Sequence, residues 1–276
     1  MAPGTNRTAI ANHIVSRLQE TLVQAREQWQ RSGIVSNCYI DNVLPVEVAL
    51  LIRQAFPAGD LLKIRSSLRE LKFIGTQMNQ YDPIVEEALY AFQDQRVVDL
   101  VSQITALQGL LPDELLYAGG ISVMTRGHFL NPHIDNSHDK NRALYRVLNL
   151  LYYVSPEWSL EKGGNLEVWP NGMGEKQQTI ESRFNRLAIM VTNKHSWHSV
   201  SPVVAQDTRC CVSNYYFSRF PAEKEDYFHV TSFRGRPNQP VRNLVLKADA
   251  GLRNAVRKIF PKGVVRTKHY YNKGKD

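Results

Sequence analysis

Long apolar runs and cysteines are scarce in this sequence. No stretch of about eighteen consecutive apolar residues occurs, which argues against a membrane-spanning helix. Residues 1–8 carry Asn and Arg where a secretory signal peptide would have its apolar core. The three cysteines, Cys38, Cys210 and Cys211, are odd in number, and an adjacent pair is poorly placed for an ordinary disulfide. These absences favour a reducing, cytoplasmic setting without a membrane partner.

Internal repeats and low-complexity segments are also lacking. The hydrophobic share of 43% and the charged share of 22% are ordinary for a globular protein, so neither a disordered nor a fibrous class is indicated. A chain of 276 residues can bury a sizeable core and still form one domain. We therefore expect one globular domain with extensions.

Acidic residues are scarce in the last part of the chain. Residues 234–276 contain twelve lysines and arginines against two aspartates, a net charge of +10, so the other residues sum to −2. A basic extension of this kind can contact nucleic acid or an acidic partner. A solvated helical face is the simpler interpretation. Apolar residues at helical spacing favour packing of this helix on the core: Leu244, Leu252, Val256, Ile259 and Phe260.

The spacing of apolar residues changes character near Gly119 and Gly120. Before this point it predicts helices over residues 8–32, 46–56 and 83–107, the last interrupted near 94–95, and one strand over residues 34–40. After it come short β-branched and aromatic runs, typical of a β-sandwich or jelly roll with helices packed outside. The strands predicted there cover residues 121–124, 147–154, 166–169, 186–192 and 210–217.

Two histidines and one acid stand at a spacing that suits a metal site. In a strand, residues i and i+2 point to the same face, so His133 and Asp135 can reach one metal ion while Ile134 points away. His198 follows about sixty residues later and adds a second imidazole. Two imidazoles and one carboxylate form the ligand set of Fe(II) oxygenases. A surface histidine with a nearby acid is the alternative for the triplet taken alone.

The sequence around these residues makes the signal specific. The segments are GHFLNPHIDN at 127–136, NLLYYV at 149–154, GGNLEVWP at 163–170, HSVSPV at 198–203, Thr208-Arg209 and YYF at 215–217. Their order resembles the 2-oxoglutarate and Fe(II)-dependent dioxygenases of the prolyl 4-hydroxylase type over about residues 120–217. The resemblance implies an α+β fold with a double-stranded β-helix (jelly-roll) core. We expect a mainly helical region at 1–118, the core at 119–220 and a basic extension at 221–276.

The resemblance also implies roles for individual residues. His133, Asp135 and His198 match the iron ligands; His195 is the rival for the third position, but the family pattern of His-x-Val-x-Pro fits His198. Arg209 matches the residue that binds the far carboxylate of 2-oxoglutarate, because a guanidinium can donate two parallel hydrogen bonds to a carboxylate. Tyr153 matches a tyrosine that shares this carboxylate, with a core tyrosine as the alternative, and Ser213 is a candidate for the same pocket.

Other residues near the motifs have two interpretations each. Arg146 either contacts substrate, as an arginine does in some relatives, or is a surface strand residue. Trp169 and Trp197 either line the mouth of the site or pack in the core. His128 and His138 are expected in loops. Residues 124–126 read Met-Thr-Arg where many relatives have a tyrosine, which weakens an expectation of prolyl substrates.

The implied activity is hydroxylation of an unactivated C–H bond, with Fe(II), 2-oxoglutarate and O2, ascorbate as a further candidate cofactor, and succinate and CO2 as products. Asp135 stands where related halogenases have a small residue, which favours hydroxylation over halogenation. Among substrate classes, a small metabolite or amino-acid-derived compound ranks first, bound in a pocket closed by the helical region and residues 228–236. A peptidyl residue such as proline is the close alternative. Nucleic-acid oxidation, supported only by the basic extension, and a non-catalytic jelly-roll binding module come last.

Overall fold

The computed structural model describes residues 4–223, 225, 227–259 and 270–271. Four helices come from the first part of the chain: α1 (Arg7–Arg31), α2 (Val46–Gln54), α3 (Pro83–Ala91) and α4 (Gln95–Thr105). They confirm the helices predicted there, including the interruption between α3 and α4. Asp94 ends that interruption because its side chain accepts a hydrogen bond from the amide of Arg96, which caps the start of α4.

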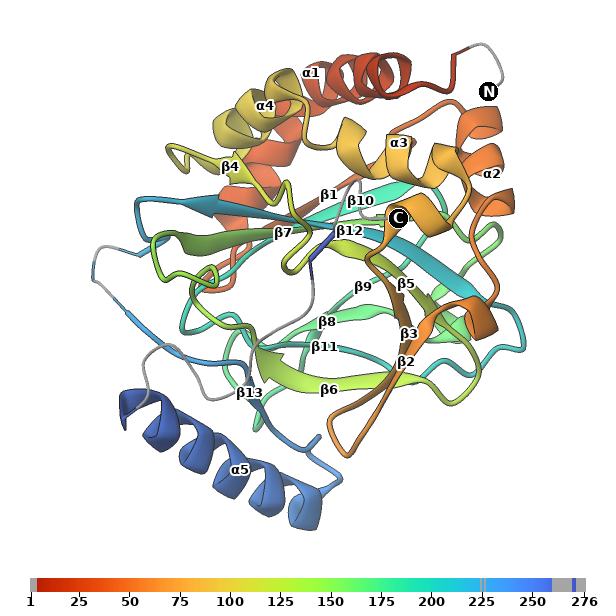
Figure 1. The fold of residues 1–276 in the computed structure, drawn as a ribbon. Helices are drawn as coiled ribbons and strands as arrows, with labels where there is room; N and C mark the ends of the chain where they lie inside the picture. The colour runs from red at the N-terminus through yellow and green to blue at the C-terminus, as the bar shows by residue number, and fades with distance from the viewer. Residues whose placement is uncertain (1–3, 224, 226, 260–269, 272–276) are drawn as a thin grey trace.

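A single curled antiparallel sheet forms the centre of the molecule. Its strand order is β1-β10-β7-β12-β5-β3-β6-β11-β8-β9, with β2, β4 and β13 pairing at the side of this path. Helices α1 to α4 cover the outer face of the part that contains β7 and β12, and β6, β8 and β11 curl underneath (Figure 1). The strands are β1 (Asn37–Asp41), β2 (Lys63–Ser66), β3 (Glu70–Gly75), β4 (Leu111–Pro112), β5 (Gly120–Met124), β6 (Phe129–Ile134), β7 (Tyr145–Tyr153), β8 (Leu166–Val168), β9 (Gln178–Ile180), β10 (Arg186–Val191), β11 (His198–Val200), β12 (Arg209–Ser218) and β13 (Ser232–Phe233).

Packing between the helices and the sheet follows the apolar faces of both. Helix α1 buries Ile10, Ile14 and Leu18 along one side, as its 3.6-residue period predicts. Strands β7, β10 and β12 are buried along almost their whole length, because the helices cover one face and the lower part of the sheet covers the other. The sheet therefore presents an enclosed inner face.

The first 118 residues contribute strands to this sheet as well as helices. Strand β1, predicted from its alternation, pairs with β10, and the unpredicted hairpin of β2 and β3 inserts β3 between β5 and β6. The residues of β2 are mostly exposed, so the hairpin lacks the buried alternate positions that reveal a strand in sequence. With β4, which pairs with β12, residues before 119 thus add to the sheet at three places.

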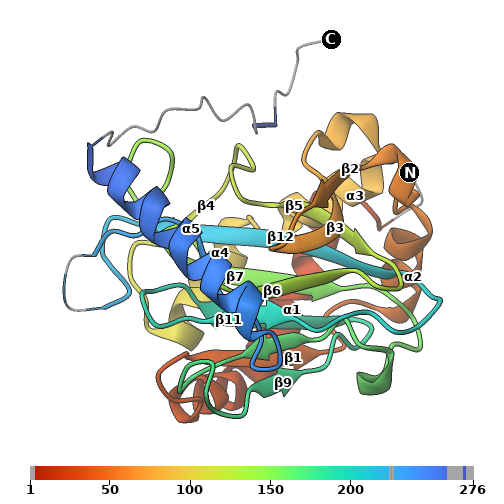
Figure 2. The ribbon, with the colours of Figure 1, turned by 90° about the horizontal axis from the view of Figure 1, so that it is seen from below.

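Helix α5 (Pro240–Ile259) lies across the lower part of the sheet (Figure 2). A helix is present at the predicted position, but two of the expected packing residues were wrong: Leu244 is 70% exposed and Leu252 is 67% exposed, while Leu246 is buried. Val256 is partly buried, and the side chain of Ile259 lies outside the described part of the structure. The helix faces the core through Leu246 and charged residues, among them Asp249, which pairs with Arg69 at 2.5 Å. Phe260 lies outside the described residues. No described helix is long and apolar enough to cross a membrane.

Candidate metal centre

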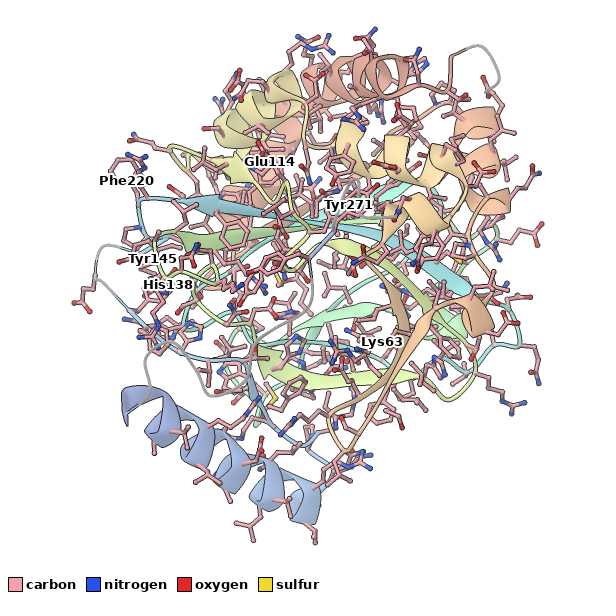
Figure 3. All side chains as sticks on the ribbon, viewed as in Figure 1. Lys63, Glu114, His138, Tyr145, Phe220 and Tyr271 are labelled. Carbon is pink, nitrogen blue, oxygen red and sulfur yellow. The ribbon has the colours of Figure 1, made fainter. Side chains whose placement is uncertain are left out.

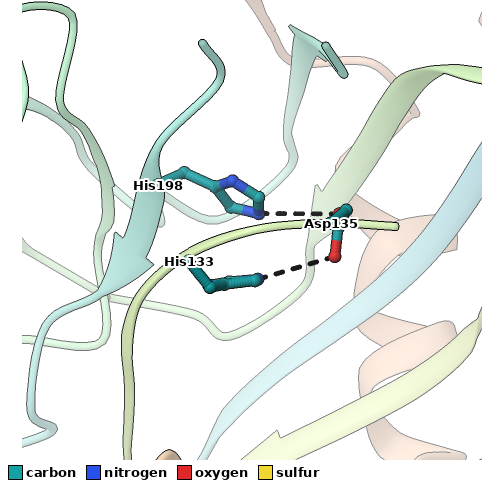
Figure 4. A group of neighbouring side chains, drawn as sticks. All are labelled: His133, Asp135 and His198. Atoms are coloured by element: carbon teal, nitrogen blue, oxygen red, sulfur yellow. Dashed lines mark ion pairs between the residues drawn. The ribbon is translucent and has the colours of Figure 1, made fainter. Parts of the chain in front are cut away.

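The two histidines and the aspartate predicted as ligands lie together on the inner face of the sheet (Figure 4). His133 on β6 pairs directly with His198 on β11, and Asp135 follows the end of β6. The Nε2 atom of His133 lies 3.6 Å from Oδ1 of Asp135, and Nε2 of His198 lies 3.7 Å from Oδ2. All three residues are buried. Strand pairing therefore brings together ligands that are about sixty residues apart in sequence.

Backbone carbonyls fix the orientation of both imidazoles. Nδ1 of His133 lies 3.0 Å from the carbonyl oxygen of Asn131, and Nδ1 of His198 lies 2.9 Å from that of Ser196. A neutral imidazole that donates from Nδ1 keeps the lone pair of Nε2 free for a metal ion. Both Nε2 atoms point toward Asp135, so the donor set fits a divalent metal of the Fe(II) type with open positions.

The electrostatics keep these groups in their metal-binding protonation states. Burial, reinforced by the neighbouring His198, lowers the pKa of His133 to about 3, and burial also lowers the pKa of His198. Burial alone would raise the pKa of Asp135, but Arg146, His198 and His133 outweigh it and hold that pKa below its ordinary value. At neutral pH the site thus offers two neutral imidazoles and one carboxylate.

Two polar side chains hold the second oxygen of Asp135. Nη1 of Arg146 lies 3.2 Å from Oδ2, and Nδ2 of Asn149 donates to the same oxygen at 3.0 Å. Arg146 is buried, so it is not the surface strand residue that was one of the two interpretations. Asn149 was not predicted from the sequence as a site residue. It lies on β7 four residues before Tyr153, so strand alternation places both side chains on one face, and this spacing could have revealed it.

Arg209 and Tyr153 form a second polar group on neighbouring strands β12 and β7. Arg209 is only 3% exposed, and within the described part of the chain its guanidinium has no acidic partner, only Oγ of Ser182 at 3.4 Å and Sδ of Met124 at 3.6 Å. Its Cζ lies 4.8 Å from the ring centre of Tyr153, whose buried hydroxyl has no hydrogen-bond partner among the described residues. Burial raises the pKa of Tyr153 to about 12, so the hydroxyl keeps its proton.

A buried cation without an acidic partner, beside a hydroxyl without a hydrogen-bond partner among the described residues, is a fitting site for a carboxylate, since both can donate to its oxygens. The double glycine of the sequence makes room there: Gly164 has φ +66°, and a Cβ on it would lie 3.3 Å from Cδ of Arg209. Ser213, the weaker candidate, lies four residues further along β12, with its Oγ 3.7 Å from Sγ of Cys211. Its contact is therefore with the cysteine.

The three other histidines near the motifs, His195, His128 and His138, lie outside the triad. His195 is largely exposed, and its Nε2 is 4.0 Å from a carboxylate oxygen of Glu223. His128 is in the loop between β5 and β6, 4.9 Å from the ring of Phe73. His138 lies 4.4 Å from the ring of Tyr145, which Figure 3 shows near one end of the sheet.

Of the two tryptophans considered for the mouth of the site, Trp169 and Trp197, the first packs in the core. Its side chain is buried, and its Nε1 donates a hydrogen bond to Oγ of Ser199 at 2.8 Å. Trp197 is half-buried, with the guanidinium carbon of Arg234 5.8 Å from the ring centre. Trp169 therefore has the packing role that the sequence left open.

Comparisons with known proteins agree with this geometry. Residues 119–217 match the 2OG-Fe(II) oxygenase superfamily. Egl nine homolog 1 of Rattus norvegicus is 26% identical over 104 residues, which are 37% of this chain and 29% of the relative. The Homo sapiens protein of the same name is also 26% identical over 104 residues, 23% of its length. The chain thus spans less than a third of the length of these curated relatives.

Solved structures share the fold at low identity. A prolyl-4-hydroxylase of Pseudomonas putida is 14% identical with a TM-score of 0.54, over 72% of this chain and 99% of that one. A prolyl hydroxylase of Trichoplax adhaerens, solved with a hypoxia inducible factor oxygen degradation domain peptide fragment, is 20% identical with a TM-score of 0.51, over 74% of this chain and 93% of that one.

Proposed function

Because residues 119–217 are a 2OG-Fe(II) oxygenase domain, we propose that the protein is a dioxygenase that hydroxylates an unactivated C–H bond. The reaction would consume 2-oxoglutarate and O2 and release succinate and CO2. His133, Asp135 and His198 would hold Fe(II), which supplies the chemistry that activates dioxygen together with the cosubstrate. The curled sheet around these residues supports the further inference that the core is a double-stranded β-helix.

The observation that carries the proposal is the buried Arg209, which has no acidic partner in the described residues, beside the buried hydroxyl of Tyr153, which has no hydrogen-bond partner there. A cation left in this state costs free energy unless a ligand completes it. The far carboxylate of 2-oxoglutarate would accept bonds from both groups and be oriented by them. A binding module without chemistry would have no need of this arrangement together with a complete metal triad.

The protein's own residues do three things in this proposal. Arg209 and Tyr153 bind and orient the cosubstrate, and the tyrosine keeps its proton because burial raises its pKa. Arg146 and Asn149 orient the carboxylate of Asp135. Burial of the triad excludes bulk water from the reacting centre, which limits side reactions.

For the substrate we propose a small metabolite or an amino-acid-derived compound. A peptidyl residue is the second candidate, and it is supported by the names of the relatives: the Trichoplax adhaerens neighbour was solved with a peptide fragment. The sequence at residues 124–126 departs from the family pattern where many relatives have a tyrosine, which supports keeping the first candidate ahead.

The test is succinate formation by the purified protein with Fe(II), 2-oxoglutarate and O2. Wild type should bind 2-oxoglutarate and form succinate slowly even without substrate. His198→Ala should abolish both, whereas His195→Ala, a matched change at an exposed histidine, should leave both unchanged. Arg209→Met should lose 2-oxoglutarate binding but keep metal binding. A wild type that neither binds 2-oxoglutarate nor forms succinate refutes the proposal.

The two substrate classes are separated by one screen. Stimulation of 2-oxoglutarate consumption is measured with a panel of amino-acid-derived metabolites and, in parallel, with proline-containing peptides. Stimulation by metabolites alone supports the first candidate, and stimulation by peptides alone replaces it with the second. Product analysis by mass spectrometry then has to find one added oxygen atom.

A further inference from the structure

The segment that links the core to α5 runs directly beside the metal-binding strand. Strand β13 pairs with β6, and this register sets Phe233 opposite His133 and Ser232 opposite Ile134. The pairing continues beyond both strands: the amide of Arg234 donates to Pro132, the amide of Asn136 donates to Thr231, and Ser137 and His229 exchange hydrogen bonds. We call residues 229–236 the C-terminal strap.

Phe233 of the strap packs against a metal ligand. Its ring is nearly parallel to that of His133, at 15° with a centroid distance of 5.0 Å, and it is buried. The ring of His198 also contacts His133, with a centroid distance of 4.1 Å and a tilt of 46° between the rings. With Nδ1 held by the carbonyl of Asn131, the imidazole of His133 is restrained both in its plane and in its rotation.

A second contact ties the strap to the strand of the distal histidine. Nη1 of Arg236 lies 2.8 Å from Oε2 of Glu167, and Nη2 donates to the carbonyl oxygen of Val200 at 2.9 Å. The hydroxyl of Ser199, the neighbour of His198, donates to the same carboxylate oxygen at 2.6 Å. Glu167 is almost fully buried, so this ion pair is well shielded from water. The strap thus reaches both strands that carry the metal histidines.

We propose that the C-terminal strap is part of the metal site, with Phe233 as the positioning residue for His133. The ring restrains the ligand before a metal ion arrives, so less conformational freedom is lost on binding. The inference rests on the proposed function only for the identity of the metal. It assigns to the basic extension a role inside the active site, independent of nucleic acid or an acidic partner.

The test measures metal binding without turnover. Co(II) is titrated into the full-length protein and followed by its visible d–d absorption, which reports coordination geometry. Phe233→Leu keeps an apolar side chain but removes the ring, and it should weaken Co(II) affinity by about 10- to 100-fold and alter the spectrum, as loss of a supporting contact does at other metal sites. Phe233→Tyr retains the ring and should bind like wild type.

Leu246→Ala is the matched control for packing. Leu246 belongs to the same small apolar cluster as Phe233 but lies on α5, so its truncation should lower the melting temperature while leaving Co(II) affinity and spectrum unchanged. The proposal is overturned if Phe233→Leu binds Co(II) with the affinity and spectrum of wild type. It is equally overturned if Leu246→Ala loses as much affinity, because general packing would then explain the effect.

Failure of the proposed function gives a different pattern. A wild type that binds Co(II), loses it in Phe233→Leu, and forms no succinate from 2-oxoglutarate supports the strap and refutes the oxygenase. A wild type that forms succinate and whose Phe233→Leu variant retains full Co(II) affinity refutes the strap and leaves the oxygenase standing.

Discussion

Asp135 and Arg146 form a buried ion pair at the metal centre, with Nη1 of the arginine 3.2 Å from Oδ2 of the carboxylate. Asn149 donates to the same oxygen, so Oδ1 is the less engaged oxygen of the carboxylate. In the metal-free protein the arginine compensates a buried negative charge that would otherwise be costly. A bound metal ion would supply a second positive charge beside it.

The first prediction concerns this compensation. Arg146→Met should lower the free energy of unfolding of the metal-free protein by about 3–5 kcal/mol, since it leaves a buried carboxylate without its cation. Co(II) should restore part of this loss because the metal ion pairs with the same carboxylate. Urea unfolding with and without Co(II) measures both values.

The control for this prediction is Arg186→Met. Arg186 pairs with Asp41 through two bonds of 2.6 and 2.9 Å, away from the triad. Its loss should cost stability equally with and without the metal. If Arg146→Met shows the same metal-independent loss, the ion pair with Asp135 has no role in compensating the ligand charge.

The second prediction concerns acid stability. The pKa of His133 is about 3 in the folded protein and about 6.5 in an unfolded chain, so the unfolded chain takes up the proton first as pH falls. The contribution of His133 to the free energy of unfolding is therefore fully present above about pH 6.5 and is lost progressively toward pH 3. Between pH 6.5 and 5 the titration of this single group should lower the free energy of unfolding of the metal-free protein by about 2 kcal/mol. Urea unfolding of wild type and His133→Gln across this range checks it, and an equal slope in both would contradict the assignment.

The third prediction separates two adjacent tyrosines. Tyr153→Phe removes a hydroxyl that has no hydrogen-bond partner among the described residues, so it should not destabilise the ligand-free protein. The affinity for 2-oxoglutarate should fall about tenfold, because the hydrogen bond from this hydroxyl to the charged carboxylate is lost. Tyr152→Phe removes a hydroxyl that donates to Oδ1 of Asn185 at 2.8 Å. It should cost about 1 kcal/mol of stability and leave 2-oxoglutarate affinity unchanged. Calorimetric titration and thermal melts measure the pair; the reverse pattern would remove Tyr153 from the cosubstrate site.

The fourth prediction concerns the anchor of the strap. Arg236→Met leaves Glu167 buried without its cation and should lower the free energy of unfolding by about 3–5 kcal/mol. Lys162→Met breaks an exposed pair with Asp207 and should cost about 0–1 kcal/mol. Urea unfolding compares the two variants. If both variants lose only a small and equal free energy of unfolding, the ion pair between Arg236 and Glu167 does not anchor the strap.

Local sequence was sufficient for much of the fold and of the site. The apolar periods predicted α1 to α4, and short β-branched and aromatic runs predicted β5, β7, β8, β10 and β12, because these patterns depend on near neighbours; β6, β9 and β11 were not predicted. The spacing of His133 and Asp135 and the motif around His198 likewise identified three residues that the fold brings together. These are properties of short segments.

The tertiary structure decided which segments pair. Period-two alternation tells which face of a strand is buried but not which strand lies beside it, so the insertion of β3 between β5 and β6 had no local signal. The same holds for Phe233, which meets His133 from a hundred residues away through sheet pairing. The burial of Arg146 against Asp135 also follows from how the sheet curls. The sequence by itself determined the three candidate ligands, and the closure of the sheet determined what surrounds and restrains them.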